Sequence, residues 1–204
     1  MKTLLTTIIC FITTVTFGQG IYEKNMGEAL SKWKNGQTTE ALAQLQRIAS
    51  VEKTNWIPRY YQAFILTTST FTIKDAQQKE EFQHAATQIL EDSTQSKNSE
   101  YWVLKGLLAT AELTSDPMNK GKELSPIIIK DYQTALAIDP QNPRAILCLN
   151  EFKINSKRFF GQDYKNELEE LKKALPLFQN NKTNIAFYPN WGKEKVEKLI
   201  ADAK

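Results

Sequence analysis

The chain has 204 residues, of which 41% are hydrophobic and 24% charged, and its formal net charge is +3 at pH 7. So small a positive excess argues against a nucleic-acid-binding protein, which needs a concentrated basic face. The two cysteines, Cys10 and Cys148, are too few for a disulfide framework, so stability has to come from burial of a hydrophobic core.

The first eighteen residues have the layout of a secretory signal peptide. Lys2 supplies a positive charge, residues 4–17 form an apolar and threonine-rich run, and small residues occupy the −3 and −1 positions before Gln19. A membrane-spanning helix needs roughly 20 apolar residues, more than this run provides. We therefore expect residues 1–18 to be removed on export and residues 19–204 to form a mature protein without a stable membrane span. An uncleaved N-terminal anchor is the alternative.

Two amphipathic runs at the start of the mature chain predict a helical hairpin. Each run places apolar side chains at the spacing of one helical face, and Asn35-Gly36 separates them with residues typical of a tight turn. The apolar positions are Tyr22, Met26, Leu30 and Trp33 in the first run, and Ala41, Leu42, Leu45, Ile48 and Ala49 in the second.

The middle of the chain predicts four more helices. A polar loop over residues 92–99 separates the second of them from the third, and residues 116–122 form a predicted loop containing proline and glycine. Ser125 is then expected to cap a helix that has Pro126 at its first position. The four predicted helices cover residues 58–70, 75–91, 101–113 and 125–138.

The segment "ALAIDPQNPRAILCLN", residues 135–150, ends one helix and starts another within four residues. Pro140 cannot continue the helix, because it has no N–H and its ring clashes with the preceding turn. Asn142 can cap the next helix, and Pro143 fits its first turn, where the missing N–H costs nothing. Cys148 in this run is expected to be a small buried apolar residue.

Three further helices are predicted at residues 143–156, 163–178 and 193–202, with Gly161 in the loop between the first two. No segment shows a convincing strand pattern. Four consecutive helical hairpins followed by a short C-terminal helix are typical of an all-α solenoid, in which each hairpin buries its apolar face against the next.

The junction "ALAIDPQNPRA" resembles the boundary between two tetratricopeptide repeats. Ala135, Asp139, Pro140 and Asn142 match that boundary. The run "GQTTEALAQLQRI" is similar to the second half of such a repeat, with Gly36 as the turn glycine and Ala41 as the small residue where helices approach closely. The spacing between units exceeds the usual period of about 34 residues, and longer loops near 92–99, 114–124 and 156–162 would absorb the excess.

The C-terminal half is similar to a group of exported bacterial tetratricopeptide-like proteins of unknown role. The elements "NPRA", "FFGQD" and "YPNWGKE" occur here in the order that this group shows. In the last element Asn190 is expected to cap the final helix, Trp191 to cover the end of the last hairpin, and Gly192 to serve the same turn. These residues therefore predict a structural device more than a ligand site.

No motif of the sequence indicates catalysis. His84, the single histidine, has no cysteine or histidine partner at the spacing of a zinc site. No nucleophile elbow and no glycine-rich phosphate loop are present, and no pair of carboxylates stands out. We therefore expect a protein that is not an enzyme and that uses no metal or cofactor.

Aromatic and basic residues on the predicted first helix of each hairpin indicate the functional hypothesis. In a tetratricopeptide-like array these helices line the concave surface, so the residues could hold an extended peptide or a partner helix. We expect a non-catalytic protein-interaction scaffold of the periplasm or cell envelope. A small-molecule or glycan binder, or an unrecognised hydrolase, is the alternative. For each aromatic residue the competing interpretation is ordinary helix packing, and for Arg144 it is an ion pair with Glu151 or Asp139. The candidate residues are Trp33, Tyr60, Tyr61, Trp102, Lys105, Arg144 and Lys153.

Overall fold

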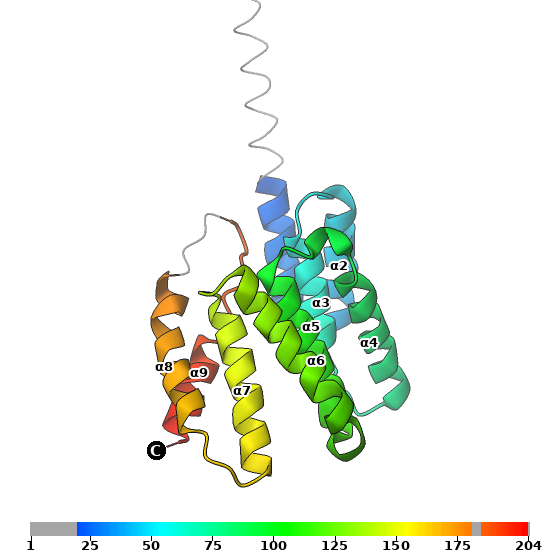
Figure 1. The fold of residues 1–204 in the computed structure, drawn as a ribbon. Coiled ribbons are helices and arrows are strands. Elements are labelled where there is room, and N and C mark those ends of the chain that lie inside the picture. Colours follow the sequence, from blue (N-terminus) through cyan, green and yellow to red (C-terminus); the bar gives the residue numbers. More distant parts are fainter. Residues whose placement is uncertain (1–19, 181–184, 204) are drawn as a thin grey trace, which may run out of the picture. The chain divides into compact units, whose positions relative to one another are not determined.

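The computed structural model describes residues 20–180 and 185–203, and all regular structure in that part of the chain is helical (Figure 1). The predicted all-α fold class is therefore confirmed. The predicted signal peptide, residues 1–18, lies outside the described residues. In the described part, no helix has both the length and the apolar character that a membrane span requires.

Helical residues 20–34 come first in the described chain and are followed by a series of helices. In order these are α2 (Thr38–Val51), α3 (Ile57–Ser69), α4 (Ala76–Leu90), the short 3-10 turn η1 (Ser93–Gln95), α5 (Ser99–Ser115), α6 (Pro117–Ile138), α7 (Pro143–Phe159), α8 (Lys165–Asn180) and α9 (Lys193–Ala201). The chain divides into two compact units, Met1–Gln62 and Ala63–Lys204, with the boundary inside α3.

The first unit contains the predicted N-terminal hairpin. Gly36 has a φ of 79°, a conformation that side chains with a Cβ rarely adopt, and this lets the chain reverse between residues 20–34 and α2. The Gln44 side-chain amide on α2 donates to the Asn25 carbonyl at 3.0 Å, which ties the two helices together. Ala29 and Ala41 are fully buried, so small residues lie inside this hairpin.

The second unit begins its helices with polar caps. The Asp75 carboxylate accepts from the Gln78 N–H at 2.7 Å at the start of α4. The Asn98 side chain accepts from the Glu100 N–H at 3.0 Å at the start of α5. Both helices begin within two residues of the predicted positions, because these caps satisfy N–H groups that have no partner inside a helix.

The start of α6 differs from the prediction. Residues 116–122 were expected to form a loop and Ser125 to cap the helix, but α6 begins at Pro117 and Pro126 lies inside it. The Asp116 carboxylate caps the helix by accepting from the Asn119 N–H at 3.3 Å. The combination of a capping residue and a following proline is therefore correct as a start signal, but it operates at Asp116-Pro117. The expected long loop at 114–124 is absent, so it cannot account for the repeat spacing.

Helices α5 and α6 approach closely at one glycine. A Cβ on Gly106 of α5 would lie 2.5 Å from the Tyr132 ring of α6, so only glycine leaves room for that ring. The Tyr132 hydroxyl lies 3.1 Å from the Thr110 hydroxyl, one turn further along α5. Tyr132 belongs to a core formed by three helices, whose buried members are Val103, Leu124, Ile128, Tyr132, Ala135, Ala145, Cys148 and Leu149.

A second core lies between α7, α8 and α9. Its buried members are Leu147, Ile154, Leu171 and Val196. Trp191, which precedes α9, packs against both this core and the core of α5, α6 and α7. Its ring also stacks on Phe64 of α3, with ring centroids 5.0 Å apart and planes 17° from parallel.

Candidate functional site

An open groove of about 380 Å³ lies between α4, α5 and α6 in the second unit. This volume falls within the range of small-molecule sites, about 300–1,000 Å³. The buried side chains of Leu90 and Leu124 contribute to its apolar lining, whereas Ile127 is 44% exposed. The groove is lined by Gln83, Thr87, Leu90, Glu91, Lys105, Leu108, Ala109, Glu112, Leu124, Ile127 and Asp131.

The charged lining of the groove is mostly acidic. Glu112 pairs with Lys120 at 2.9 Å, and the Lys105 ammonium lies 4.5 Å from the centroid of the Trp102 ring. Within the described part of the chain, Asp131 makes no hydrogen bond or ion pair. Burial raises the pKa of Asp131 to about 6, and Lys105 and Lys130 only partly oppose that rise. The groove therefore gains a negative charge as the pH rises through about 6.

His84 lies on α4 beside the helix face that lines this groove, and is not itself one of the lining residues. The His84 side chain is exposed. Its neighbours on the helix, Gln83 directly before it and Thr87 one turn after it, both line the groove. The position of His84 beside a groove could not be predicted from the sequence, because the groove exists only once α4, α5 and α6 are packed together. An exposed imidazole beside an apolar surface can donate or accept a hydrogen bond or bind a metal that arrives with a ligand.

The predicted partner-binding residues differ in how accessible they are. Tyr60 is fully buried and Tyr61 is 6% exposed, and their rings meet edge to face at 5.5 Å. Trp102 is half-buried, and its indole N–H donates to the Ser96 carbonyl at 2.8 Å. Trp33 and Lys153 are also half-buried. Lys105 and Trp102 thus lie at or beside the groove. A partner-binding role for these residues stays a prediction.

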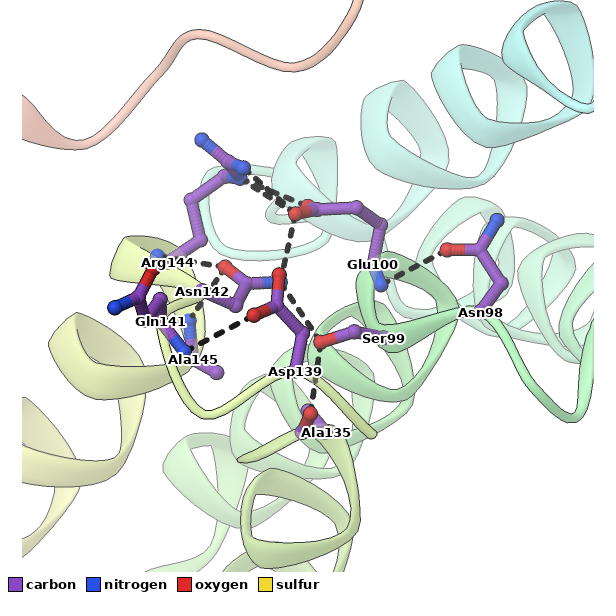
Figure 2. A network of polar contacts seen from close by, with 9 residues as sticks. All are labelled: Asn98, Ser99, Glu100, Ala135, Asp139, Gln141, Asn142, Arg144 and Ala145. Carbon is purple, nitrogen blue, oxygen red and sulfur yellow. Dashed lines mark hydrogen bonds and ion pairs between the residues drawn. The ribbon is translucent and has the colours of Figure 1, made fainter. Parts of the chain in front are cut away.

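Arg144 is placed in the interior, where it forms an ion pair with Glu100 (Figure 2). Each of these side chains is 1% exposed. The Arg144 Nε donates to Glu100 Oε1 at 2.9 Å and to Oε2 at 2.8 Å, and Nη2 donates to Oε1 at 2.7 Å. The partners expected for Arg144 were wrong, because Asp139 accepts from the Gln141 N–H and Glu151 pairs with Lys195.

Asn142 extends the ion pair into a network that joins three helices (Figure 2). Its Nδ2 donates to Glu100 Oε1 at 2.7 Å and to the Ser99 hydroxyl at 2.9 Å, while its Oδ1 caps α7 by accepting from the Arg144 and Ala145 N–H groups. Ser99 in turn donates to the Ala135 carbonyl near the end of α6 at 2.9 Å. The turn at Pro140 is therefore fixed to the start of α5 by buried polar contacts.

Tyr188 covers the Arg144 side of this network. The Arg144 guanidinium lies 5.4 Å from the centroid of the Tyr188 ring. Burial and the negative charge of Glu100 raise the pKa of the Tyr188 hydroxyl, and Arg144 partly opposes them. Glu100 balances the charge of Arg144, and the Tyr188 ring covers the guanidinium. Arg144 therefore stabilises the packing of the unit and offers no exposed cation.

The residues predicted to be structural lie at turns and in cores. Asn142 and Ala135 are buried, Pro143 is the first residue of α7, and Pro140 lies in the turn before it. Gly161 follows α7 with a φ of 66°.

The capping role expected for Asn190 at the last helix was wrong. Gly192 occupies the position before α9 with a φ of 107°, and the helix has no side-chain cap there. A Cβ on Gly192 would also lie 2.9 Å from Leu147. A glycine at this position therefore fits both the backbone conformation and the close approach of α7.

The described residues contain neither a cluster of metal ligands nor a reactive thiol. Over residues 20–180 and 185–203, no group of three or more histidine, cysteine, aspartate or glutamate side chains could hold a metal ion. Burial raises the pKa of the Cys148 thiol far above its usual range, so the thiol is neutral in the core of α5, α6 and α7.

Comparison with known proteins identifies a structural neighbour. No family model and no curated protein matches the sequence. Among solved structures, the chain is similar to the HusA haemophore from Porphyromonas gingivalis, with a TM-score of 0.76 and 21% sequence identity. The match covers 91% of this chain and 92% of that chain, and at this identity it shows a shared fold. The tetratricopeptide resemblance has no support from a family model and stays a proposal.

Proposed function

We propose that this protein is a non-catalytic binding protein that acts outside the cytoplasm and carries a flat, largely apolar small molecule of the tetrapyrrole class, such as haem. The observation that carries the proposal is the likeness to a haemophore over nine-tenths of both chains. The predicted signal peptide supports a location in the periplasm, in the cell envelope or outside the cell.

The groove between α4, α5 and α6 is the site at which we place this ligand. Leu90, Leu108 and Leu124 offer apolar contact to one face of a planar ring. His84 could supply an imidazole nitrogen to an iron centre, and Lys105 could pair with a carboxylate of the ligand. Because the other charged groups of the lining are acidic, the remaining carboxylate of a tetrapyrrole would point toward solvent.

Titration of the purified protein with hemin tests this function. Binding should shift the Soret band and quench tryptophan fluorescence, with metal-free protoporphyrin IX as the second ligand. A His84→Ala variant should alter the hemin spectrum while leaving protoporphyrin affinity unchanged, since only hemin offers an iron to the imidazole. Absence of a saturable spectral change with either ligand would contradict the proposal.

Two isoleucines on α6 provide a matched pair of variants for locating the site. Ile127 lines the groove and is 44% exposed, whereas Ile138 is 38% exposed and lies at the last residue of the helix, outside the groove lining. Ile127→Glu should weaken hemin binding by about tenfold, because it places a charge in an apolar contact. Ile138→Glu should bind like the wild type. Equal affinities for the two variants would place the ligand elsewhere.

The protein-interaction scaffold expected from the sequence is the second candidate function. The half-buried pair of Trp102 and Lys105 on α5 favours it, because aromatic and basic side chains of this kind recur at peptide-binding surfaces. Capture of envelope proteins by the wild type and by a Trp102→Ala variant tests it. Equal recovery of every captured protein would remove this candidate, and a recovered protein that hemin displaces would assign both ligands to one site.

A further inference from the structure

Four large apolar side chains project from the corners between helices in the second unit. Phe71 follows α3, Met118 lies in the first turn of α6, and Phe159 and Phe160 end α7. Their exposed fractions are 44%, 79%, 66% and 67%, respectively. Side chains this exposed contribute little to folding, and a group of them marks an interaction site more often than a single one does.

These four residues lie at the same end of the unit, which we call the corner end. Helices α3, α5 and α7 finish there, and α4, α6 and α8 start there, as the connections at the lower end of Figure 1 show. Each of the four exposed residues therefore lies at a helix end or in a connection on this side of the unit. Three connections that carry exposed apolar side chains thus lie on one side of the unit, where a single extended surface could reach them.

Basic residues flank each apolar corner. Lys74 follows Phe71, Lys122 follows Met118 by one turn, and Arg158 precedes the two phenylalanines. Carboxylates alternate with these basic residues, because Asp75 follows Lys74, Glu123 follows Lys122 and Asp163 precedes Lys165, so the charge of this end is mixed. Asp75 caps α4 and Asp116 caps α6 by accepting backbone N–H groups.

The two phenylalanines form the most prominent corner. Their rings meet edge to face at 5.1 Å, and the Arg158 guanidinium lies 4.8 Å from the centroid of the Tyr164 ring. This arrangement presents an exposed aromatic pair beside a cation on a short turn. Aromatic side chains accompanied by lysine or arginine favour the interface between lipid headgroups and acyl chains.

We propose that the corner end docks on the surface of an anionic lipid bilayer, with Phe159, Phe160, Met118 and Phe71 entering the interface and the flanking lysine and arginine residues contacting lipid phosphates. Exposed side chains from three helix connections would then contact the membrane, and none of them is buried in a core of the protein. Binding of this kind is peripheral and requires no membrane-spanning helix.

Flotation of the full protein with lipid vesicles tests the proposal. Vesicles of phosphatidylcholine mixed equally with phosphatidylglycerol should carry the protein upward, and vesicles of phosphatidylcholine alone should carry much less. The bound fraction should fall as salt is raised, because the ionic contribution is screened. A Phe159→Ser/Phe160→Ser variant should lower the partition coefficient by about tenfold or more, since it removes two aromatic side chains from the interface.

Met118 and Ile138 provide a matched control on a single helix. Met118→Ser changes the corner end of α6, and Ile138→Ser changes the last residue of the same helix, at its other end. The first variant should bind vesicles more weakly and the second as well as the wild type. All these substitutions are at exposed positions, so circular dichroism and hemin affinity should stay at wild-type values.

Three results would overturn the proposal. The first is absence of binding to anionic vesicles, and the second is equal vesicle binding by the wild type and the double phenylalanine variant. The third is a wild-type protein that self-associates in sedimentation analysis while the double variant is monomeric, which would assign the corner end to a second copy of the chain. Hemin binding is measured separately, so failure here leaves the proposed carrier function unaffected.

Discussion

Replacement of Arg144 by methionine should destabilise the second unit strongly. The change removes three donor contacts to the Glu100 carboxylate, at 2.9, 2.8 and 2.7 Å, and leaves Asn142 as a donor at 2.7 Å. A carboxylate that is 1% exposed cannot recover those contacts from water. Breaking a buried pair of this kind typically costs about 3–5 kcal/mol. Since 1 kcal/mol shifts the melting temperature by about 2–4 °C in a chain of this size, the expected fall is roughly 6–20 °C.

A double-mutant cycle measured by urea unfolding tests this reasoning. The Glu100→Met/Arg144→Met variant should lose less stability than the sum of the two single variants, because removal of both partners leaves no unpaired buried charge. Lys172→Met is a suitable control, since its partner Glu169 is 62% exposed and surface pairs are worth about 0–1 kcal/mol. A loss below about 1 kcal/mol for Arg144→Met, or additive single losses, would refute the argument.

Gly106 and Asp131 each give a further prediction. Gly106→Ala should lower the free energy of unfolding by about 1–3 kcal/mol in thermal unfolding, because its Cβ would lie 2.5 Å from the Tyr132 ring. The control Gly121→Ala on α6 has no atom within 4 Å of its Cβ, so it should leave the stability unchanged or raise it by up to about 1 kcal/mol. The affinity for metal-free protoporphyrin IX, whose carboxylates are anionic and which offers His84 no iron, should rise by roughly threefold as the pH falls through about 6, because protonation of Asp131 removes a negative charge from the groove. Asp131→Asn should abolish that pH dependence in fluorescence titrations, and a ligand whose affinity instead falls at low pH would be cationic.

The turn between α6 and α7 was predictable because its signals are local. Asp139, Pro140, Asn142 and Pro143 end one helix and begin the next within five positions, and α6 ends at Ile138 and α7 begins at Pro143 as expected. The same kind of signal at Ser125-Pro126 predicted a helix start that the structure does not have, since α6 begins at Pro117. That proline is exposed on α6, where the continuing helix tolerates it.

The polar network and the groove could not be predicted from such signals. Glu100 and Arg144 are separated by 44 residues, and no spacing rule pairs residues on helices that are not yet placed in space. Glu100 has an acidic side chain in the first turn of a helix, which by itself indicates favourable dipole interaction and an exposed position. The groove likewise needs α4, α5 and α6 to be packed before its lining exists.

The position of Trp191 bears on how the protein is made. This residue lies near the C-terminus, and yet it contacts both hydrophobic cores of the second unit and stacks on Phe64 of α3. During synthesis these cores stay incomplete until the segment that contains Trp191 has left the ribosome. A polypeptide released before this segment is made would keep apolar surface available to chaperones and proteases.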